Sequence, residues 1–267
     1  MSYSKRLEEA RKAFAERNLK ASASAHDPER IARATEKHGG AGSLYLGDLV
    51  YGGLDGIITT FAIVSGVAGA QLGANVVLIM GLANLFADGF SMATGAFLSS
   101  RSEQEYYERE WQRESWEVKH FPEGERAELL EIYRDQGYSE EDARRLVEIQ
   151  SRDPERWVKA MMVQELGLMR DERKPLLSAV ATLVAFVVSG AMPLLVYLVG
   201  LLVPISAGVA FPVSMGLSGL ALFGLGAAKV LVTERNIFRS GVEMLLVGGL
   251  AAGVAYVVGA LLKGIGG

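Results

Sequence analysis

Five apolar segments, each about as long as a membrane is thick, constrain this sequence more than any other feature. A helix needs about 20 apolar residues to cross a hydrocarbon core of about 30 Å. Segments of this kind recur at residues 49–70, 75–98, 176–199, 213–232 and 242–262. Backbone groups in lipid must be hydrogen-bonded within the segment. We therefore expect an all-α polytopic membrane protein with five transmembrane helices. Pro193 predicts a kink in the third, and Pro212 should lie in the connection before the fourth.

Charged residues are concentrated outside these segments and indicate the sides of the membrane. Of 27 Lys and Arg residues, 9 precede Leu44 and 14 lie between Arg101 and Lys174. Short loops rich in Lys and Arg stay in the cytosol. The N-terminus, residues 101–174 and the loop at 235–239 should thus share the cytosolic side, with the C-terminus opposite. The N-terminus lacks a signal-type apolar core, so we expect no cleaved secretion signal.

The pattern divides the chain into four regions. The extension at the N-terminus should contain one amphipathic helix, from Ser4 to Lys20, and a Gly-rich connection. The very short connection QLGAN makes the first two spans an antiparallel hairpin. The regions are a cytosolic N-terminal extension (1–45), transmembrane helices one and two (46–99), a cytosolic helical domain inserted between spans two and three (100–174), and transmembrane helices three to five (175–267).

Helix-breaking residues divide the inserted region into four helices. The second span has no break before the first of them, which should continue to about His120. Pro122 suits the first position of the next helix. Ser139 with Asp142 resembles a capping box that opens a third helix, and Asp153 before a proline favours the start of a fourth.

Four of the polar or sulfur-containing side chains inside the first two spans stand out by their depth or their spacing. Asn84, Asp88 and Met92 are spaced four apart, so they share one helical face. Asp55 falls near the same membrane depth as Met92, and a charge there costs about 2.5–3.5 kcal/mol on insertion scales. We take these residues as candidates for an ion path. The other interpretation of Asp55 is a carboxyl capped by a neighbouring hydroxyl or amide. A neighbouring face of the second span carries only small residues, which favours close packing of another helix, at Ala83, Ala87, Ser91, Gly95 and Ser99.

Carboxylate pairs in the inserted region indicate a metal site. Two successive helices each carry glutamates three residues apart, and the turn between them folds one pair towards the other. Like charges at this spacing repel unless a cation lies between them. The last helix adds a glutamate and two methionines, and this mixture of hard and soft ligands favours a transition metal. Alone, each feature is weak, because Glu pairs are common on solvated helices and Met pairs usually belong to a core. The candidate ligands are Glu114, Glu117, Glu125, Glu128, Met161, Met162 and Glu165.

Other classes of site are excluded by what the sequence lacks. It has no cysteine, which rules out disulfides and thiolate metal sites. The di-iron signature of ferritin-like bundles, a Glu-x-x-His pair on each of two helices, is missing, because only Glu117 and His120 have this spacing. No paired nucleophile and base is evident, and we expect neither an enzyme nor a nucleic-acid partner.

The segments LDGIITTFAIVSGVAGA and ADGFSMATGAFLSS, with the five-span order and the inserted domain, resemble the vacuolar iron transporter family. The resemblance covers Leu46 to the C-terminus. It implies a cytosolic metal-binding domain and a homodimer that exchanges Fe²⁺, and often Mn²⁺, for protons. It also implies that Asp55 and Met92 line the transport path, and that the glutamates and methionines named above bind metal. Leu54 stands where many members have Asn, and Ala96 where many have Glu; these departures bear on metal preference and ion coupling.

We therefore expect a membrane transporter that exports or sequesters Fe²⁺, and Mn²⁺, from the cytosol by proton antiport. Metal ions are its substrate, and no tightly bound cofactor is expected. Its partners would be membrane lipid, metal ions, protons and a second copy of the chain. The host membrane would be the inner membrane in a bacterium or the vacuolar membrane in a eukaryote. The alternative is a membrane-anchored metal sensor or scaffold without transport, but an anchor has no need of the polar face in the second span.

Overall fold

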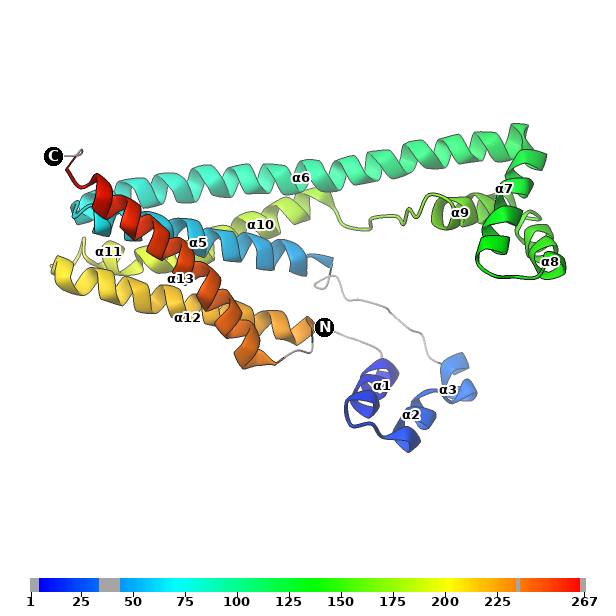
Figure 1. Ribbon diagram of the computed structural model, residues 1–267, viewed down its shortest axis with the longest axis horizontal. Helices are drawn as coiled ribbons and strands as arrows, with labels where there is room; N and C mark the ends of the chain where they lie inside the picture. The colour runs from blue at the N-terminus through cyan, green and yellow to red at the C-terminus, as the bar shows by residue number, and fades with distance from the viewer. Residues whose placement is uncertain (1–4, 34–43, 234–235, 265–267) are drawn as a thin grey trace. The chain divides into compact units, whose positions relative to one another are not determined.

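The computed structural model describes residues 5–33, 44–233 and 236–264, and every regular element in that part of the chain is a helix (Figure 1). This agrees with the predicted all-α fold class. The chain divides into two compact units. One comprises residues 1–96 with 176–267, and the other comprises residues 97–175.

Five helices are long and apolar enough to cross a membrane, which is the predicted number. Several begin one or two turns before the predicted position, because apolar patterning finds the lipid-buried part and not the polar flanks. Asn236, for example, caps the last helix by accepting a hydrogen bond from the amide of Arg239 at 3.1 Å. The five are α5 (Leu46–Gly69), the apolar part of α6 (Ala74–His120), α10 (Pro175–Gly190) continued by α11 (Leu195–Val199), α12 (Ala207–Thr233) and α13 (Ile237–Leu262).

Two prolines mark details of the predicted spans. The third span is interrupted where the kink at Pro193 is predicted, because a 3-10 turn, Met192–Leu194, separates α10 from α11. The hydroxyl of Ser214 donates to the carbonyl oxygen of Pro193 at 2.5 Å, which satisfies an acceptor beside the break. Pro212, predicted in a connection, lies inside α12. It is the sixth residue of that helix, beyond the four whose N–H groups have no helical acceptor, so its missing N–H leaves the carbonyl oxygen of Gly208 without its helical donor.

Close approach of helix backbones holds the membrane helices together. α5 lies beside α12 and α13 (Figure 1). A Cβ atom added to Gly52 would lie 2.6 Å from the carbonyl oxygen of Thr182 in α10, and one added to Gly190 would lie 2.7 Å from the carbonyl oxygen of Gly56. Larger residues would push α5 and α10 apart. In lipid, such van der Waals contact is a main source of helix association.

One face of the apolar part of α6 packs against the third span. Gly81 lies against the side chain of Leu194, and Gly89 lies against Phe186. The small-residue face that the sequence predicts to pack is a different one and is exposed in the single chain. Its residues are Ala83, Ala87, Ser91, Gly95 and Ser99.

The N-terminal extension forms several short helices instead of the single predicted one. The predicted helix from Ser4 to Lys20 is interrupted by Arg17, whose φ of 52° is left-handed. Asn18 then caps a new helix with its side chain. The predicted Gly-rich connection lies outside the described residues. The described helices are α1 (Lys5–Ala15), α2 (Leu19–Ala25) and α3 (Pro28–Arg33).

The second unit is a small helical bundle that begins with the charged part of α6. The predicted helix starts are confirmed. Pro122 is the first residue of α7, and the side chains of Ser139 and Asp153 accept hydrogen bonds from the amides of Asp142 and Arg156. The added helices are α7 (Pro122–Asp135), α8 (Glu140–Gln150) and α9 (Pro154–Gln164).

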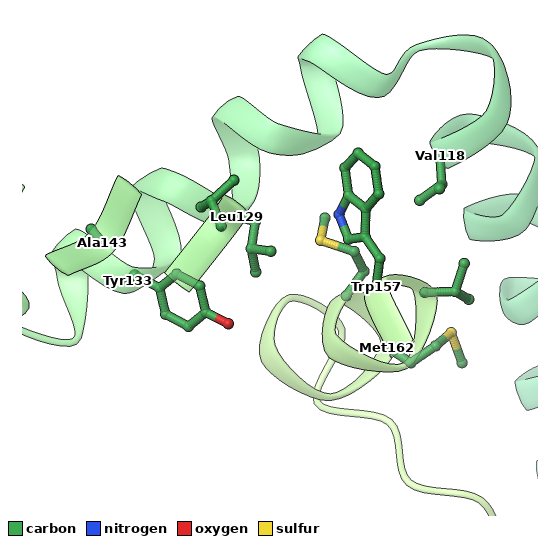
Figure 2. Close-up of a cluster of buried hydrophobic side chains, with 9 residues drawn as sticks. Val118, Leu129, Tyr133, Ala143, Trp157 and Met162 are labelled. Atoms are coloured by element: carbon green, nitrogen blue, oxygen red, sulfur yellow. The ribbon is translucent and has the colours of Figure 1, made fainter. Parts of the chain in front are cut away.

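Nine buried side chains from four helices form the core of this bundle (Figure 2). Trp157 and Met162 reach it from α9, and Leu129 and Tyr133 reach it from α7. The guanidinium of Arg126 covers the ring of Trp157 at 5.3 Å. The core residues are Val118, Leu129, Tyr133, Ala143, Val147, Trp157, Val158, Met161 and Met162.

The segment after α9 returns along α6 and is hydrogen-bonded to it. The side-chain amide of Gln104 donates to the carbonyl oxygens of Asp171 and Arg173, and the hydroxyl of Ser100 donates to the carboxylate of Asp171. Arg173 also pairs with Glu103 at 3.0 Å. These contacts close the bundle at the end where the chain enters α10.

We predict that Gly52→Ala lowers the melting temperature of the protein in detergent, measured by circular dichroism at helix wavelengths. The added methyl group overpacks the contact with Thr182, which typically costs about 1–3 kcal/mol. Gly47→Ala is the matched control, since Gly47 lies in the same helix and a Cβ atom there meets nothing within 4 Å. Equal melting temperatures for the two variants would contradict the proposed close contact.

Candidate functional site

Three of the predicted carboxylates converge at the corner between α6 and α7. Glu114 and Glu117 lie in the last turns of α6, and Glu125 lies in the first turn of α7. The corner forms because α6 ends at His120 and Pro122 starts a new helix in a different direction. Oxygen atoms of the three glutamates lie within 4.8 Å of one another.

Two of these carboxylates are buried and incompletely bonded. Glu114 is 1% exposed and Glu125 is 5% exposed. Both oxygens of Glu114, and Oε2 of Glu125, have no hydrogen-bond partner. Burial, followed by the charges of neighbouring carboxylates, raises the pKa of each side chain from 4.5 to about 7. A buried carboxylate without a partner is costly, so this corner favours a proton or a cation.

Glu128 and Glu165 interact with this group from its solvent side. Both are exposed and line the same shallow hollow on the bundle. Partial burial, and then the charge of Glu128, raise the pKa of Glu165. Glu128 and Glu165 also contribute to the raised pKa values of the two buried glutamates. All five predicted glutamates therefore act on one another electrostatically, although only three place oxygens within 4.8 Å.

Arg113 and Glu110 belong to the same group, and the sequence analysis missed both. The Arg113 guanidinium contacts Glu110 at 2.9 Å, Glu114 at 2.6 Å and Glu117 at 2.7 Å. Glu110 is 9% exposed, and a second contact with Arg109 at 2.8 Å helps hold its pKa below the ordinary range. The spacing of Arg113 from Glu110 at i−3 and from Glu117 at i+4 could have indicated those two contacts, whereas the adjacent position of Glu114 could not.

The two predicted methionine ligands lie in the core. Met161 and Met162 are fully buried and pack with Val118 and Leu129, which directly follow Glu117 and Glu128 in the sequence. Figure 2 shows Met162 among the core side chains. A place in the hydrophobic core is the usual role of a Met pair, as the sequence analysis noted, and this pair has that place. Their role as soft ligands stays a prediction.

The carboxylate trio fits a divalent ion after a small adjustment. Transition ions bind carboxylate oxygen at about 2.0–2.2 Å, so two oxygens on one ion can be at most about 4.4 Å apart. The observed limit of 4.8 Å exceeds this by a few tenths of an ångström. Rotation of one side chain would close that gap. The donor set is all oxygen, which suits hard and borderline divalent ions.

The predicted path residues of the first unit lie on facing parts of α5 and α6. The Asn84 amide donates to the Thr59 hydroxyl at 3.4 Å, and that hydroxyl donates to the backbone carbonyl oxygen of Asp55 at 2.8 Å. Thr59 thus bonds to the backbone of Asp55 and not to its carboxylate. The carboxylates of Asp55 and Asp88 are near enough to repel each other. Met92 shares the half-buried face of Asn84 and Asp88.

Two further polar residues on α5 were not found from the sequence. Thr59 links Asp55 to Asn84, as described above. Asp48 lies in the first turn of α5. It is seven residues before Asp55, which places both carboxylates on one helical face. The seven-residue spacing was the signal that could have identified Asp48.

Comparison of the amino-acid sequence with known proteins places the chain in a family. The profile described as "VIT family" matches residues 46–260. A protein named vacuolar iron transporter from Toxoplasma gondii (strain ATCC 50861 / VEG) is 38% identical, covering 96% of this chain and 88% of that one. One of the same name from Plasmodium falciparum (isolate 3D7) is 33% identical, covering 97% of each chain. Vacuolar iron transporter 1 of Arabidopsis thaliana is 35% identical, covering 83% of this chain and 87% of that one.

We predict that, without divalent metal, the bundle formed by residues 97–175 loses stability as the pH rises from about 5 to about 7.5. Folded Glu114 holds its proton up to a pKa of about 7, whereas the unfolded side chain loses it near 4.5. The folded state thus binds more protons in this interval, so the free energy of unfolding falls as pH rises. Tryptophan fluorescence measures this in the full chain, because Trp111, Trp116 and Trp157 all lie in this unit.

Glu114→Gln should reduce this pH dependence, because position 114 then has no proton to lose and only Glu125 keeps a pKa raised to about 7. Glu141→Gln is the matched control, since Glu141 is an exposed glutamate on α8, and it should keep the wild-type slope. A wild-type melting temperature that rises over the same interval would contradict the prediction.

Proposed function

This chain belongs to the VIT family, and we propose that it is a membrane transporter that moves Fe²⁺ out of the cytosol in exchange for protons. The observation that carries the proposal is the pair of neighbouring carboxylates, Asp55 and Asp88, within apolar helices. The names of the relatives support iron as the substrate. Because the family and these relatives are transporters, the chain is not an enzyme.

Asp55 binds a metal ion and protons in alternation in this proposal. A carboxylate at membrane depth is costly when charged, and either a cation or a proton neutralises it. Asp88 supplies a second negative charge for a divalent ion, Asn84 an amide oxygen, and Met92 a sulfur ligand that suits a transition metal. When the ion leaves, protonation removes the repulsion between the two carboxylates. Metal release is thereby coupled to proton uptake.

The bundle of residues 97–175 serves as a cytosolic metal-collecting domain. Its five glutamates, Glu114, Glu117, Glu125, Glu128 and Glu165, repel one another until a divalent ion binds, and the burial of Glu114 supports this assignment. Oxygen ligands also suit Mn²⁺, which we propose as a second substrate. Met161 and Met162 are the proposed soft ligands on the core side.

The active form is proposed to be a homodimer in the membrane. The exposed small-residue face of α6, from Ala83 to Ser99, supports this, because such faces allow close helix contact and nothing in the single chain covers this one over the described residues. We place the protein in the vacuolar membrane of a eukaryotic host or the inner membrane of a bacterial one. The N-terminus is proposed to lie in the cytosol, from the Lys and Arg distribution.

A metal sensor or scaffold without transport is the competing function. It would need the metal-collecting domain but not the polar residues inside the spans. Asp55 and Asp88 would then destabilise the inserted helices by a few kcal/mol without serving a function. Metal uptake into proteoliposomes separates the two functions, since a sensor would bind metal in detergent and move none.

We predict that Asp55→Asn abolishes Fe²⁺-dependent proton flux in proteoliposomes. The change keeps the size of the side chain but removes its charge and its exchangeable proton. Asp88→Asn should retain partial flux, because Asp55 still provides one carboxylate. Fluorescence of an internal pH dye measures the flux.

Thr94→Val is the matched control for these variants, because Thr94 is an exposed polar residue of the same α6 segment and donates only to the carbonyl oxygen of Phe90. It should transport normally. Wild-type flux in Asp55→Asn, with melting temperatures equal to the wild type, would remove Asp55 from the mechanism.

We also predict that the N-terminal extension and the bundle share one side of the membrane and the C-terminus lies on the other. The chain contains no cysteine, so single cysteines at Ala23, Glu141 and Gly264 can be labelled separately. A membrane-impermeant maleimide added to sealed vesicles should modify the first two together and the third only from the opposite face. Labelling of all three from one side would refute the five-span topology.

A further inference from the structure

One guanidinium group lies among the carboxylates of the proposed metal site. Arg113 contacts Glu110 through Nε at 2.9 Å, Glu114 through Nη2 at 2.6 Å and Glu117 through Nη1 at 2.7 Å. Each nitrogen serves a different carboxylate, so the side chain acts as a three-way bridge. Two of the three carboxylates belong to the trio whose oxygens lie within 4.8 Å of one another.

The contact with Glu114 is electrostatic and incomplete. Although Arg113 lies 2.6 Å from Oε1, neither oxygen of Glu114 has a hydrogen bond of acceptable geometry. Arg113 lowers the pKa of Glu114, but burial and the other glutamates still hold that pKa near 7. The arginine therefore offsets only part of the repulsion. A divalent ion at the same oxygens would carry twice the charge and could bind each carboxylate directly.

Glu110 provides an anchor for the arginine when it leaves the other two glutamates. Glu110 is not one of the trio, and its Oε2 accepts from Nε of Arg113. Its Oε1 is already held by Arg109 at 2.8 Å. The side chain of Arg113 is 42% exposed, whereas that of Glu114 is 1% exposed. The two terminal nitrogens can thus turn towards solvent while Nε keeps its bond to Glu110.

We propose that Arg113 is a built-in competitor of the metal ion, which holds Glu114 and Glu117 together in the empty site and is displaced from both when metal binds. This inference rests on the proposed metal-collecting role and assigns the residue that limits its affinity. Arginine stays charged at every physiological pH, so the competition cannot be removed by deprotonation. A collecting site must also release its ion, and a competing cation favours release.

The test is the affinity of the full-length protein in detergent for Mn²⁺, measured by competition with a fluorescent chelator. Arg113→Gln should bind Mn²⁺ roughly tenfold more tightly, the factor expected for the loss of one competing interaction of ordinary strength. Arg109→Gln is the matched control, because Arg109 forms its ion pair with Glu110, which is outside the trio. Its affinity should stay within about twofold of the wild type, since its charge lies farther from the site.

Stability provides a second measurement that does not depend on transport. In the absence of metal, Arg113→Gln should lower the melting temperature reported by tryptophan fluorescence, because nothing then separates Glu114 from Glu117. Saturating Mn²⁺ should raise the melting temperature of this variant by more than that of the wild type, as tighter binding requires. If Arg113→Gln does not fold, Arg113→Lys takes its place in the test. Its gain in affinity should be smaller, because lysine keeps the positive charge but lacks the planar guanidinium that contacts three carboxylates at once.

The outcomes separate this inference from the proposed function. Unchanged or weaker Mn²⁺ binding by folded Arg113→Gln overturns the competitor role alone, because Arg113 would then only orient the glutamates. Absence of Mn²⁺ binding by the wild type, or equal binding by Glu114→Gln, overturns the metal site itself. Tighter binding by Arg113→Gln together with unchanged binding by Arg109→Gln supports the inference.

Discussion

Repulsion among the carboxylates at the corner of α6 and α7 is the constraint on which the bundle depends. Taking a carboxylate out of water costs several kcal/mol, and placing others beside it adds to that cost. Glu114 nonetheless lies 1% exposed beside Glu117 and Glu125. The core of the bundle supplies the opposing free energy, since Val118 and Leu129 follow the acidic residues directly and bury against α9. Packing of the apolar side of these helices therefore holds their charged side in a state that a cation would relieve.

In the membrane helices, too, packing holds acidic side chains close together, here in lipid instead of water. Asp55 and Asp88 lie near each other on apolar helices, where lipid offers nothing to solvate them. Backbone contact through Gly52 and Gly190 brings α5 and α10 together, and the hydrogen bond from Asn84 to Thr59 connects α6 to α5. Small residues and hydroxyl groups take the place that hydrophobic burial has in water, because helices in lipid gain little from hiding apolar surface.

One continuous helix contributes to both groups of carboxylates. α6 contains Asp88 in its apolar part and Glu114 in its charged part, and no proline occurs between them. Arg113 introduces a cation of the chain's own into the acidic corner. In the proposed function, this corner collects ions for transport, so it must bind them and then release them. An internal competitor satisfies both needs better than a fully preorganised cage would.

The sequence by itself determined the all-α fold, the number of candidate spans and the caps at Ser139 and Asp153, because each depends on local composition and spacing. It also indicated that the glutamates of α6 and α7 would meet, since the proline between the helices defines a turn. Only the tertiary structure decided which faces pack: Gly81 and Gly89 of α6 are covered, while the small residues from Ala83 to Ser99 are not. It likewise decided that Met161 and Met162 enter the core and that Arg113 bridges three glutamates. Periodicity defines the faces of a helix, but which face is buried depends on neighbours that are distant in sequence.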